Sequence, residues 1–287
     1  MDMLAHQTAA ALIGMHPCYT EAARLHHGRL HLAVAPECNL GCRYCERCVG
    51  ACADGVAGPG TAARVLSAPE ANALVSEVRR DGWLHVVGIA GPGEPLANRA
   101  TLATLRLLQQ THPDLLLCLS TNGLELEAAL PDLLDAGLRA LTVTINAVHP
   151  KTAGQLYAWA AIDGQRLLGQ TAAEHTLRRQ WDGLAAAVRA GLLVKVNSVL
   201  IPGITGAELE PVARRAGDLG AHRHNIMPLI PRGQMRHRRA PTPAELEHAR
   251  ARCERWIPQF RGCTQCRADA IVPPLSAKGG IACAACA

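Results

Sequence analysis

Short apolar runs recur along the chain, bounded by glycine, proline or polar residues. Six of them have the length and aliphatic content of buried strands, at residues 29–35, 84–90, 115–120, 141–146, 193–200 and roughly 224–229. Stretches with apolar residues at helical spacing separate them, at residues 70–80, 101–111, 126–136, 176–190 and 207–219. The alternation predicts repeated βα units with parallel strands inside and helices outside.

Repeated βα units predict an α/β protein whose sheet curls into a partial (β/α)6 barrel over residues 29–231. Residues 1–28 are predicted to form an N-terminal extension. Residues 232–287 are richer in Arg, Pro and Cys and are predicted to form a helical and looped C-terminal extension. In such barrels the functional side chains lie at the carboxyl ends of the strands and in the following loops. The polar motifs after the strands are therefore the candidates for a site.

Composition narrows the classes of function. Hydrophobic residues make up 49% of the 287, enough for a large core, and the formal charge is +5. Lys and Arg form no block of five or six, so nucleic-acid binding is not expected. Neither a run of 18 uncharged apolar residues nor a basic leader is present, so we expect a cytoplasmic protein without membrane association. Twelve cysteines in that reducing compartment favour metal or redox chemistry over disulfides.

Three cysteines follow the first predicted strand with the spacing CxxxCxxC, namely Cys38, Cys42 and Cys45. One loop can thereby bind three irons of a [4Fe-4S] cluster and leave the fourth iron open. The open iron can chelate S-adenosylmethionine (SAM), and the reduced cluster can cleave it to a 5′-deoxyadenosyl radical. Tyr44 before the last cysteine is typical of this motif. The alternative is a structural zinc site with Cys48 or Cys52 as its fourth ligand.

Loops after the later strands supply candidate SAM-binding residues. The GPGEP sequence after the second strand contributes a glycine-rich backbone and a carboxylate for the amino group of SAM, through Gly91, Gly93, Glu94 and Pro95. The STNG and TINAV sequences follow the next two strands and contribute Ser120, Asn122 and Asn146. GPGEP by itself fits an ordinary turn, but beside CxxxCxxC it favours SAM over zinc.

These motifs and others, in the same order, resemble the NifB family, the radical SAM proteins of nitrogenase cofactor biosynthesis. The resemblance rests on HPCY at 16–19, RLH at 29–31, VAPECNLGCRYC at 34–45, IAGPGEPLAN at 89–98, CLSTNG at 118–123, TINAV at 144–148, KVNSVLIPGI at 195–204, HNIMPLI at 224–230 and CTQCRADA at 263–270. CxxxCxxC is common to the superfamily, whereas HPCY and CxxCRADA are specific to the family.

The resemblance implies a radical SAM barrel with a SAM-binding [4Fe-4S] cluster and two further [4Fe-4S] clusters that serve as substrate. It implies that the enzyme, a carbide-inserting lyase or transferase, fuses the two into an eight-iron core with a carbide from the SAM methyl group and an added sulfur. One SAM donates the methyl group, and a second provides the radical that abstracts hydrogen from it. The implied ligands are Cys18, His31, Cys52 and Cys118 for one substrate cluster, and Cys263 and Cys266 for the other.

Residue type alone leaves alternatives open at these positions. A strand cysteine such as Cys118 is commonly a small buried hydrophobe, and a strand histidine such as His31 is commonly a core residue. Other histidines compete for the role of nitrogen ligand, namely His16, His26 and His27. Cys48 competes with Cys52, which we favour. The tail pair, Cys283 and Cys286, matches no position of the family.

The resemblance also implies partners. They are cluster donor and carrier proteins of nitrogenase assembly and an electron donor such as a ferredoxin or flavodoxin. We expect a monomer, and we expect the carrier domain fused to some relatives to be absent, because the chain ends soon after CRADA. Two other functions stay open: a peptide-modifying radical SAM maturase with auxiliary clusters, and a non-catalytic iron–sulfur or zinc scaffold.

Overall fold

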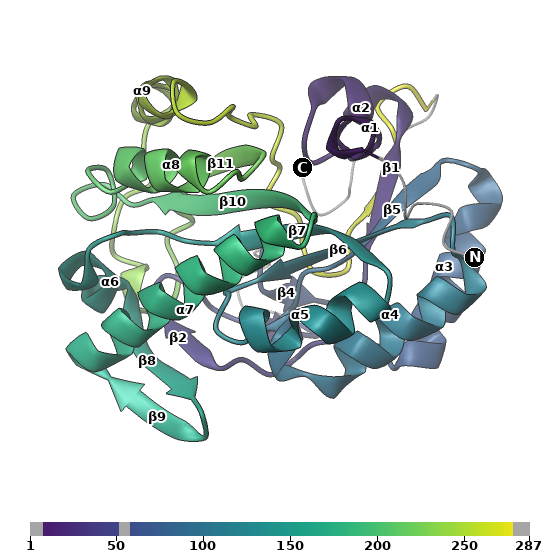
Figure 1. Cartoon of the computed structure of the whole chain (residues 1–287), viewed down its shortest axis with the longest axis horizontal. Helices are drawn as coiled ribbons and strands as arrows, with labels where there is room; N and C mark the ends of the chain where they lie inside the picture. The colour runs from purple at the N-terminus through teal and green to yellow at the C-terminus, as the bar shows by residue number, and fades with distance from the viewer. Residues whose placement is uncertain (1–7, 52–57, 278–287) are drawn as a thin grey trace.

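A curled, mainly parallel sheet forms the centre of the protein (Figure 1). The computed structural model describes residues 8–51 and 58–277. The parallel strands are β1 (Gly28–His31), β5 (Leu84–Ile89), β6 (Leu116–Thr121), β7 (Leu138–Thr144), β10 (Leu193–Leu200) and β11 (Arg223–Pro228). Together with β12 (Ile271–Val272), which is antiparallel to β1, they form a seven-stranded sheet in the order β11-β10-β7-β6-β5-β1-β12. The predicted α/β partial barrel is confirmed.

Helices follow the strands as the periodicity predicts. They are α3 (Ala68–Val78), α4 (Arg99–Thr111), α5 (Leu126–Asp135), α7 (Gly169–Arg189) and α8 (Leu209–Asp218). Ser67 begins α3 with a capping box to Glu70, which satisfies backbone donors of the first turn. Helix α7 begins earlier than the predicted residue 176, because its first turn follows a hairpin that the sequence pattern does not reveal.

That hairpin joins β8 (Tyr157–Ile162) to β9 (Gln165–Leu168) after the short helix α6 (Pro150–Leu156). The two turn residues, Asp163 and Gly164, both have positive φ, as tight hairpin turns require. Strand β8 also pairs with β2 (Leu40–Cys42), which lies inside the cysteine motif. The hairpin therefore supports the loop that carries the motif.

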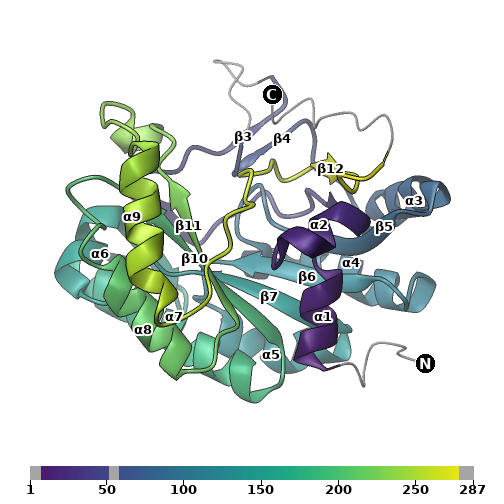
Figure 2. The same ribbon diagram turned by 90° about the horizontal axis from the view of Figure 1, so that it is seen from above.

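The extensions pack against the barrel. The N-terminal one contains α1 (Ala9–Met15) and α2 (Glu21–His26), which lie across the sheet from α4 and α5 (Figures 1 and 2). The Tyr19 hydroxyl donates to the carbonyl oxygens of Leu141 and Leu193, each at 3.0 Å. Leu12 and Tyr19 also pack on inward-facing side chains near the amino ends of four strands, namely Val86, Leu116, Ala140 and Leu193. The N-terminal extension thus closes one end of the barrel interior.

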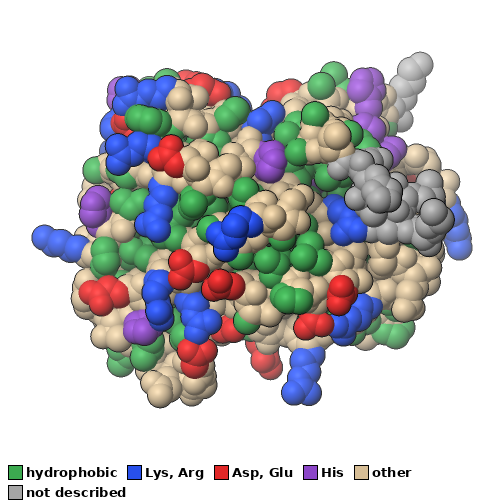
Figure 3. All heavy atoms as spheres, in the orientation of Figure 1, with side chains coloured by type: hydrophobic (Ala, Val, Ile, Leu, Met, Phe, Trp, Pro, Cys, Tyr) green, Lys and Arg blue, Asp and Glu red, His purple; other side chains and the backbone are tan. Residues whose placement is uncertain are grey.

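The remaining elements are short or peripheral. They are β3 (Cys48–Val49) paired with β4 (Thr61–Ala62), the helix α9 (Pro243–Glu254), and the 3-10 turns η1 (Arg79–Asp81), η2 (Pro95–Ala97) and η3 (Gly233–Met235). None of the helices among the described residues has the length and apolar character needed to cross a membrane. On the face shown in Figure 3, basic and acidic side chains are interspersed.

Candidate functional site

The inner face of the curled sheet lines a cavity. Alternate strand residues point inward, so each strand contributes side chains with a period of two. They are Arg29 and His31, Val86 and Gly88, Cys118 and Ser120, Thr142 and Thr144, Lys195, Asn197 and Val199, and Asn225 and Met227. Most of these inward side chains carry a polar or metal-binding group, which suits a binding site better than a packed core.

The three cysteines of the CxxxCxxC motif lie on the cavity wall together. Burial raises the pKa of the Cys42 thiol well above its usual value, and the neighbouring sulfurs of Cys45 and Cys38 raise it further. Burial, with Cys38, also raises the pKa of Cys45 to about 11. Three thiols that line one cavity suit a cluster with three protein ligands, and iron binding would displace their protons.

The GPGEP loop is docked on the segment that leads into the motif. The Gly93 N–H donates to the Ala35 carbonyl at 2.6 Å, and the Glu94 N–H donates to the Glu37 carbonyl at 2.7 Å. A Cβ atom on Gly93 would overlap the Glu37 carbonyl, so only glycine permits this approach. The first two site motifs are therefore parts of one rigid unit.

Glu94 links that unit to the STNG loop. Its carboxylate is 3% exposed and accepts from the Thr121 hydroxyl at 2.5 Å, the Asn122 N–H at 2.6 Å and the Leu96 N–H at 3.1 Å. Burial outweighs these bonds and raises the pKa of Glu94 to about 7. The carboxylate also reaches the cavity wall, beside Gly93, Ser120 and Asn122.

Other predicted SAM-binding residues support the site from behind. Gly91 has a φ of +130° and its carbonyl accepts from Ala35, while the Pro95 carbonyl accepts from the Thr101 hydroxyl at 2.7 Å. Neither is among the described residues that line the cavity. Their direct contact with SAM stays a prediction.

Asn146 is likewise fully buried behind the described cavity wall. Its amide donates to the Tyr44 hydroxyl at 2.8 Å and accepts from the Val199 N–H at 2.8 Å. The side chain thereby fixes the aromatic residue of the cysteine motif against β10. Its predicted contact with SAM is not tested by this arrangement.

A second group of predicted ligands surrounds Gly88. His31 and Cys118 lie in register with Gly88 on the strands to either side, and a Cβ atom at Gly88 would lie 3.3 Å from His31 Cδ2. Burial raises the pKa of Cys118 to about 12, with the nearby sulfur of Cys18 contributing. Cys118 lies in the middle of β6, which extends to Thr121.

His31 is oriented for binding through one nitrogen. Its Nδ1 lies 3.1 Å from the Arg267 carbonyl oxygen. A carbonyl only accepts, so Nδ1 carries the hydrogen and Nε2 keeps its lone pair. Burial, with the nearby Arg29 charge, lowers the pKa of His31 to about 4, so the ring is neutral near pH 7. A neutral imidazole with one free lone pair fits an iron ligand.

The competition between Cys48 and Cys52 is not resolved by the structure, in which Cys48 is disulfide-bonded. Cys48 lies in β3 and is not among the described residues that line the cavity. Cys52 lies outside the described residues, and so do Cys283 and Cys286.

The third group is Cys263 and Cys266, on the segment before β12, and it faces side chains that sequence reasoning missed. Arg29 donates from Nη2 to Cys266 Sγ at 3.0 Å. Lys195 donates from Nζ to the Cys18 carbonyl at 3.2 Å and lies over the rings of Tyr19 and Phe260. The two-residue period of a strand could have identified these cations, because residues two positions apart point to the same face. Arg29 precedes His31 by two positions, and Lys195 precedes Asn197 by two.

His16 of the HPCY sequence also faces the cavity. Its Nδ1 accepts from the Cys18 N–H at 3.1 Å, so the neutral ring carries its hydrogen on Nε2. That Nε2 is buried and has no partner among the described residues. With Nδ1 occupied in this way, His16 is less suited than His31 to bind iron.

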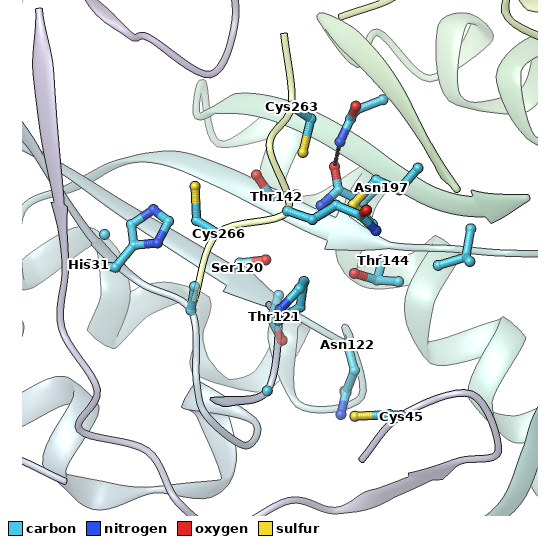
Figure 4. Close-up of a pocket in the computed structure, with 18 of the residues that line it drawn as sticks. His31, Cys45, Ser120, Thr121, Asn122, Thr142, Thr144, Asn197, Cys263 and Cys266 are labelled. Carbon is cyan, nitrogen blue, oxygen red and sulfur yellow. Dashed lines mark hydrogen bonds between the residues drawn. The ribbon is translucent and has the colours of Figure 1, made fainter. Parts of the chain in front are cut away.

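The groups occupy two ends of one cavity. In Figure 4, Cys45 and Asn122 lie at one end, and His31, Cys266 and Cys263 lie toward the other, with Ser120 and Thr121 between. The SAM motifs thus share a space with the predicted substrate-cluster ligands.

Comparison with known proteins agrees with this geometry. The radical SAM superfamily matches residues 32–216. The chain is 44% identical over 264 residues to the FeMo cofactor biosynthesis protein NifB of Klebsiella pneumoniae. The aligned region covers 89% of this chain and 56% of that protein. The chain is 38% identical over 274 residues to the NifB of Methanocaldococcus jannaschii, with 94% and 90% covered.

Among solved structures, a radical SAM methyltransferase from Sphaerobacter thermophilus shares the fold, with a TM-score of 0.54 and 20% identity over 81% of this chain and 64% of that one. The chain spans about half the length of the Klebsiella protein and most of the Methanocaldococcus one. With the family's motifs converging on a single cavity, the chain belongs to the NifB family of the radical SAM superfamily.

Proposed function

We propose that this protein is a radical SAM enzyme that fuses two bound [4Fe-4S] clusters into the eight-iron core precursor of the nitrogenase cofactor. The fusion inserts a carbide derived from the SAM methyl group and adds a sulfur. The observation that carries the proposal is that three separate groups of cysteines line one cavity. A radical SAM enzyme without further clusters needs only the first group, so the other two groups call for an additional use of bound iron.

Residues at the first end bind and orient SAM. When bound by Cys38, Cys42 and Cys45, a [4Fe-4S] cluster supplies the electron that cleaves SAM. The docked GPGEP backbone and the Glu94 carboxylate offer acceptors for the SAM ammonium group, and Ser120 and Asn122 offer further polar contacts. The close fit of the loops keeps this end rigid, which favours orientation of the reacting groups.

Residues at the other end hold the substrate clusters. Cys18, His31 and Cys118, which line this end of the cavity, bind one cluster in this proposal, and Cys263 and Cys266 bind the other. Cys52, which lies outside the described residues, is proposed as a further ligand of the first cluster. A pair of thiolates leaves irons open, and an imidazole is a weaker iron ligand than a thiolate. Such incomplete and mixed ligand sets suit clusters that must change ligands and leave.

The same function requires partners. We propose that separate cluster donor proteins load this cavity, that carrier proteins accept the product, and that a ferredoxin or flavodoxin reduces the SAM-binding cluster. Loading of the precursors and release of the product both require the substrate end of the cavity to open to the surface. Release requires the wider opening, since the product is larger than either precursor.

Isotope transfer tests the function. The protein, loaded anaerobically with iron and sulfide, is reduced in the presence of SAM carrying a ¹⁴C-labelled methyl group. We expect label in the extracted iron–sulfur product, and none with Cys42→Ala. Label confined to protein or peptide, with SAM still cleaved, would favour a peptide-modifying maturase. Metal binding without any SAM cleavage would favour a scaffold.

A further inference from the structure

Arg29 lies between the two groups of predicted substrate-cluster ligands. Its side chain points inward from β1 and is 5% exposed. Nη2 donates to Cys266 Sγ at 3.0 Å, and the guanidinium also interacts electrostatically with the sulfurs of Cys18 and Cys263. It therefore faces a thiol from the N-terminal extension and two from the C-terminal extension. In Figure 4, Cys266 lies beside His31. His31 is the next inward-facing residue of β1 after Arg29.

Two buried cations of the cavity have no carboxylate partner among the described residues. Arg29 and Lys195, which is 6% exposed, form no ion pair with a carboxylate in the described part of the chain. Burying such charges is unfavourable unless an anion compensates them. Thiolate-bound iron–sulfur clusters are anions, so they supply the missing charge.

Arg29 also has hydrogen-bond donors to spare. A guanidinium carries five N–H donors in a planar fork, and Arg29 uses Nη2 for Cys266 while its buried Nε has no partner among the described residues. A lysine would offer a compact point charge and no such fork. The remaining donors are available to a second acceptor across the cavity.

We infer that Arg29 is a positioning residue that holds the two substrate clusters side by side, donating N–H bonds to sulfur on both sides and offsetting the repulsion between the two anions. Lys195 adds a second positive charge on the Cys18 side. This inference rests on the proposed function, because it requires two clusters at this end of the cavity. This role explains why β1 directs an arginine side chain into the barrel interior.

The test compares Arg29→Met, which removes charge and donors, with Arg29→Lys, which keeps the charge and removes the fork. Arg139→Met is the matched control, because Arg139 lies on β7, another strand of the same sheet, and is not among the described residues that line the cavity. Each protein is loaded with iron and sulfide, and its iron is counted. Paramagnetic resonance then gives the reduction potentials of the clusters and the spin–spin splitting between them. The SAM-binding cluster is recognised by the change of its signal when SAM is added.

We expect wild type and Arg139→Met to show splitting between the two other clusters. Arg29→Met should lose the splitting and make reduction of those clusters about tenfold less favourable, which is 59 mV for a one-electron couple. Arg29→Lys should keep the potential and lose most of the splitting. The SAM-binding cluster should be unaffected.

The outcomes separate the inference from the proposed function. About four irons in the wild type would overturn the proposed function and this inference with it. About twelve irons with wild-type splitting and potentials in either Arg29 variant would overturn only the inference. Twelve irons without splitting in the wild type would also overturn the inference, because the two substrate clusters would not be adjacent. If Arg29→Met does not fold, the comparison of Arg29→Lys with the wild type still tests the inference.

Discussion

The His31 ring nitrogen Nδ1 lies 3.1 Å from the carbonyl oxygen of Arg267, a residue 236 positions further along the chain. The bond fixes the tautomer, and it leaves Nε2 free on the cavity side of β1. Arg267 follows Cys266 directly in the CRADA sequence. The C-terminal extension therefore carries predicted ligands of one substrate cluster and also orients a predicted ligand of the other.

His31→Ala should abolish a nitrogen coupling to a cluster signal in pulsed electron paramagnetic resonance of the reduced protein. Three cysteines still retain that cluster, so iron content should fall little, while formation of the eight-iron product is lost. His237→Ala, at an exposed position, is the control. If the coupling persists in His31→Ala and only thermal stability drops, His31 is a core residue, and the nitrogen ligand lies at His16, His26 or His27.

Gly88→Ala should disturb the same cluster sterically. The added methyl group would lie 3.3 Å from His31 Cδ2, between the strands that carry His31 and Cys118. We expect bound iron to fall from about twelve to about eight per chain, with SAM cleavage retained. Gly154→Ala, where the nearest atom is 3.8 Å away, should bind iron as the wild type does. Full iron content in Gly88→Ala would mean that no cluster occupies the space beside Gly88.

Cys42→Ala should abolish SAM cleavage, because two thiolates hold the radical-generating cluster poorly. Iron should fall by about four per chain, since the other groups of ligands are separate. Cys253→Ala, a buried cysteine in α9 outside the cavity wall, serves as control. The assay is 5′-deoxyadenosine formed after reduction, and parental rates in Cys42→Ala would place the radical site elsewhere.

Glu94 should make stability depend on pH. Burial raises its pKa from 4.5 to about 7, so the folded protein keeps a proton that the unfolded chain has lost. The resulting stabilisation is present below about pH 4.5 and is lost as the pH rises through 7; it amounts to roughly 3 kcal/mol at most. The melting temperature should therefore fall more from pH 5 to pH 8 in the wild type than in Glu94→Gln.

Glu127→Gln, at an exposed position in α5, should keep the wild-type pH dependence and so isolates the contribution of Glu94. Histidines with lowered pKa values act in the opposite direction, but they are common to all three proteins and cancel in the comparison. Identical pH dependence in Glu94→Gln and wild type would show that the carboxyl titrates normally.

Hydrophobic periodicity was sufficient to predict the six parallel strands, because each is short, apolar and bounded by turns. It missed the β8–β9 hairpin, since that hairpin depends on the distant pairing of β8 with β2. It also missed the inward cations. Arg29 and Lys195 lie in runs that are apolar on average, and only their register with His31 and Asn197 shows that they share the cavity face.

The candidate site was predicted where a motif carries the chemistry directly. The CxxxCxxC thiols and Glu94 reach the cavity as the motifs imply. Asn146 was singled out for its place after a strand, but a polar residue there can equally bond within the wall, as its contacts with Tyr44 and Val199 show. Such a difference depends on side-chain packing, which spacing does not encode.

Iron content tests the central claim most directly. The wild-type chain, reconstituted anaerobically with excess iron and sulfide and freed of unbound metal, should bind about twelve irons and twelve acid-labile sulfides, four of each for three cubane clusters. Mössbauer spectra should assign the iron to [4Fe-4S] clusters. A reproducible ceiling near four irons, with SAM cleavage intact, would contradict the account and leave a radical SAM enzyme without substrate clusters.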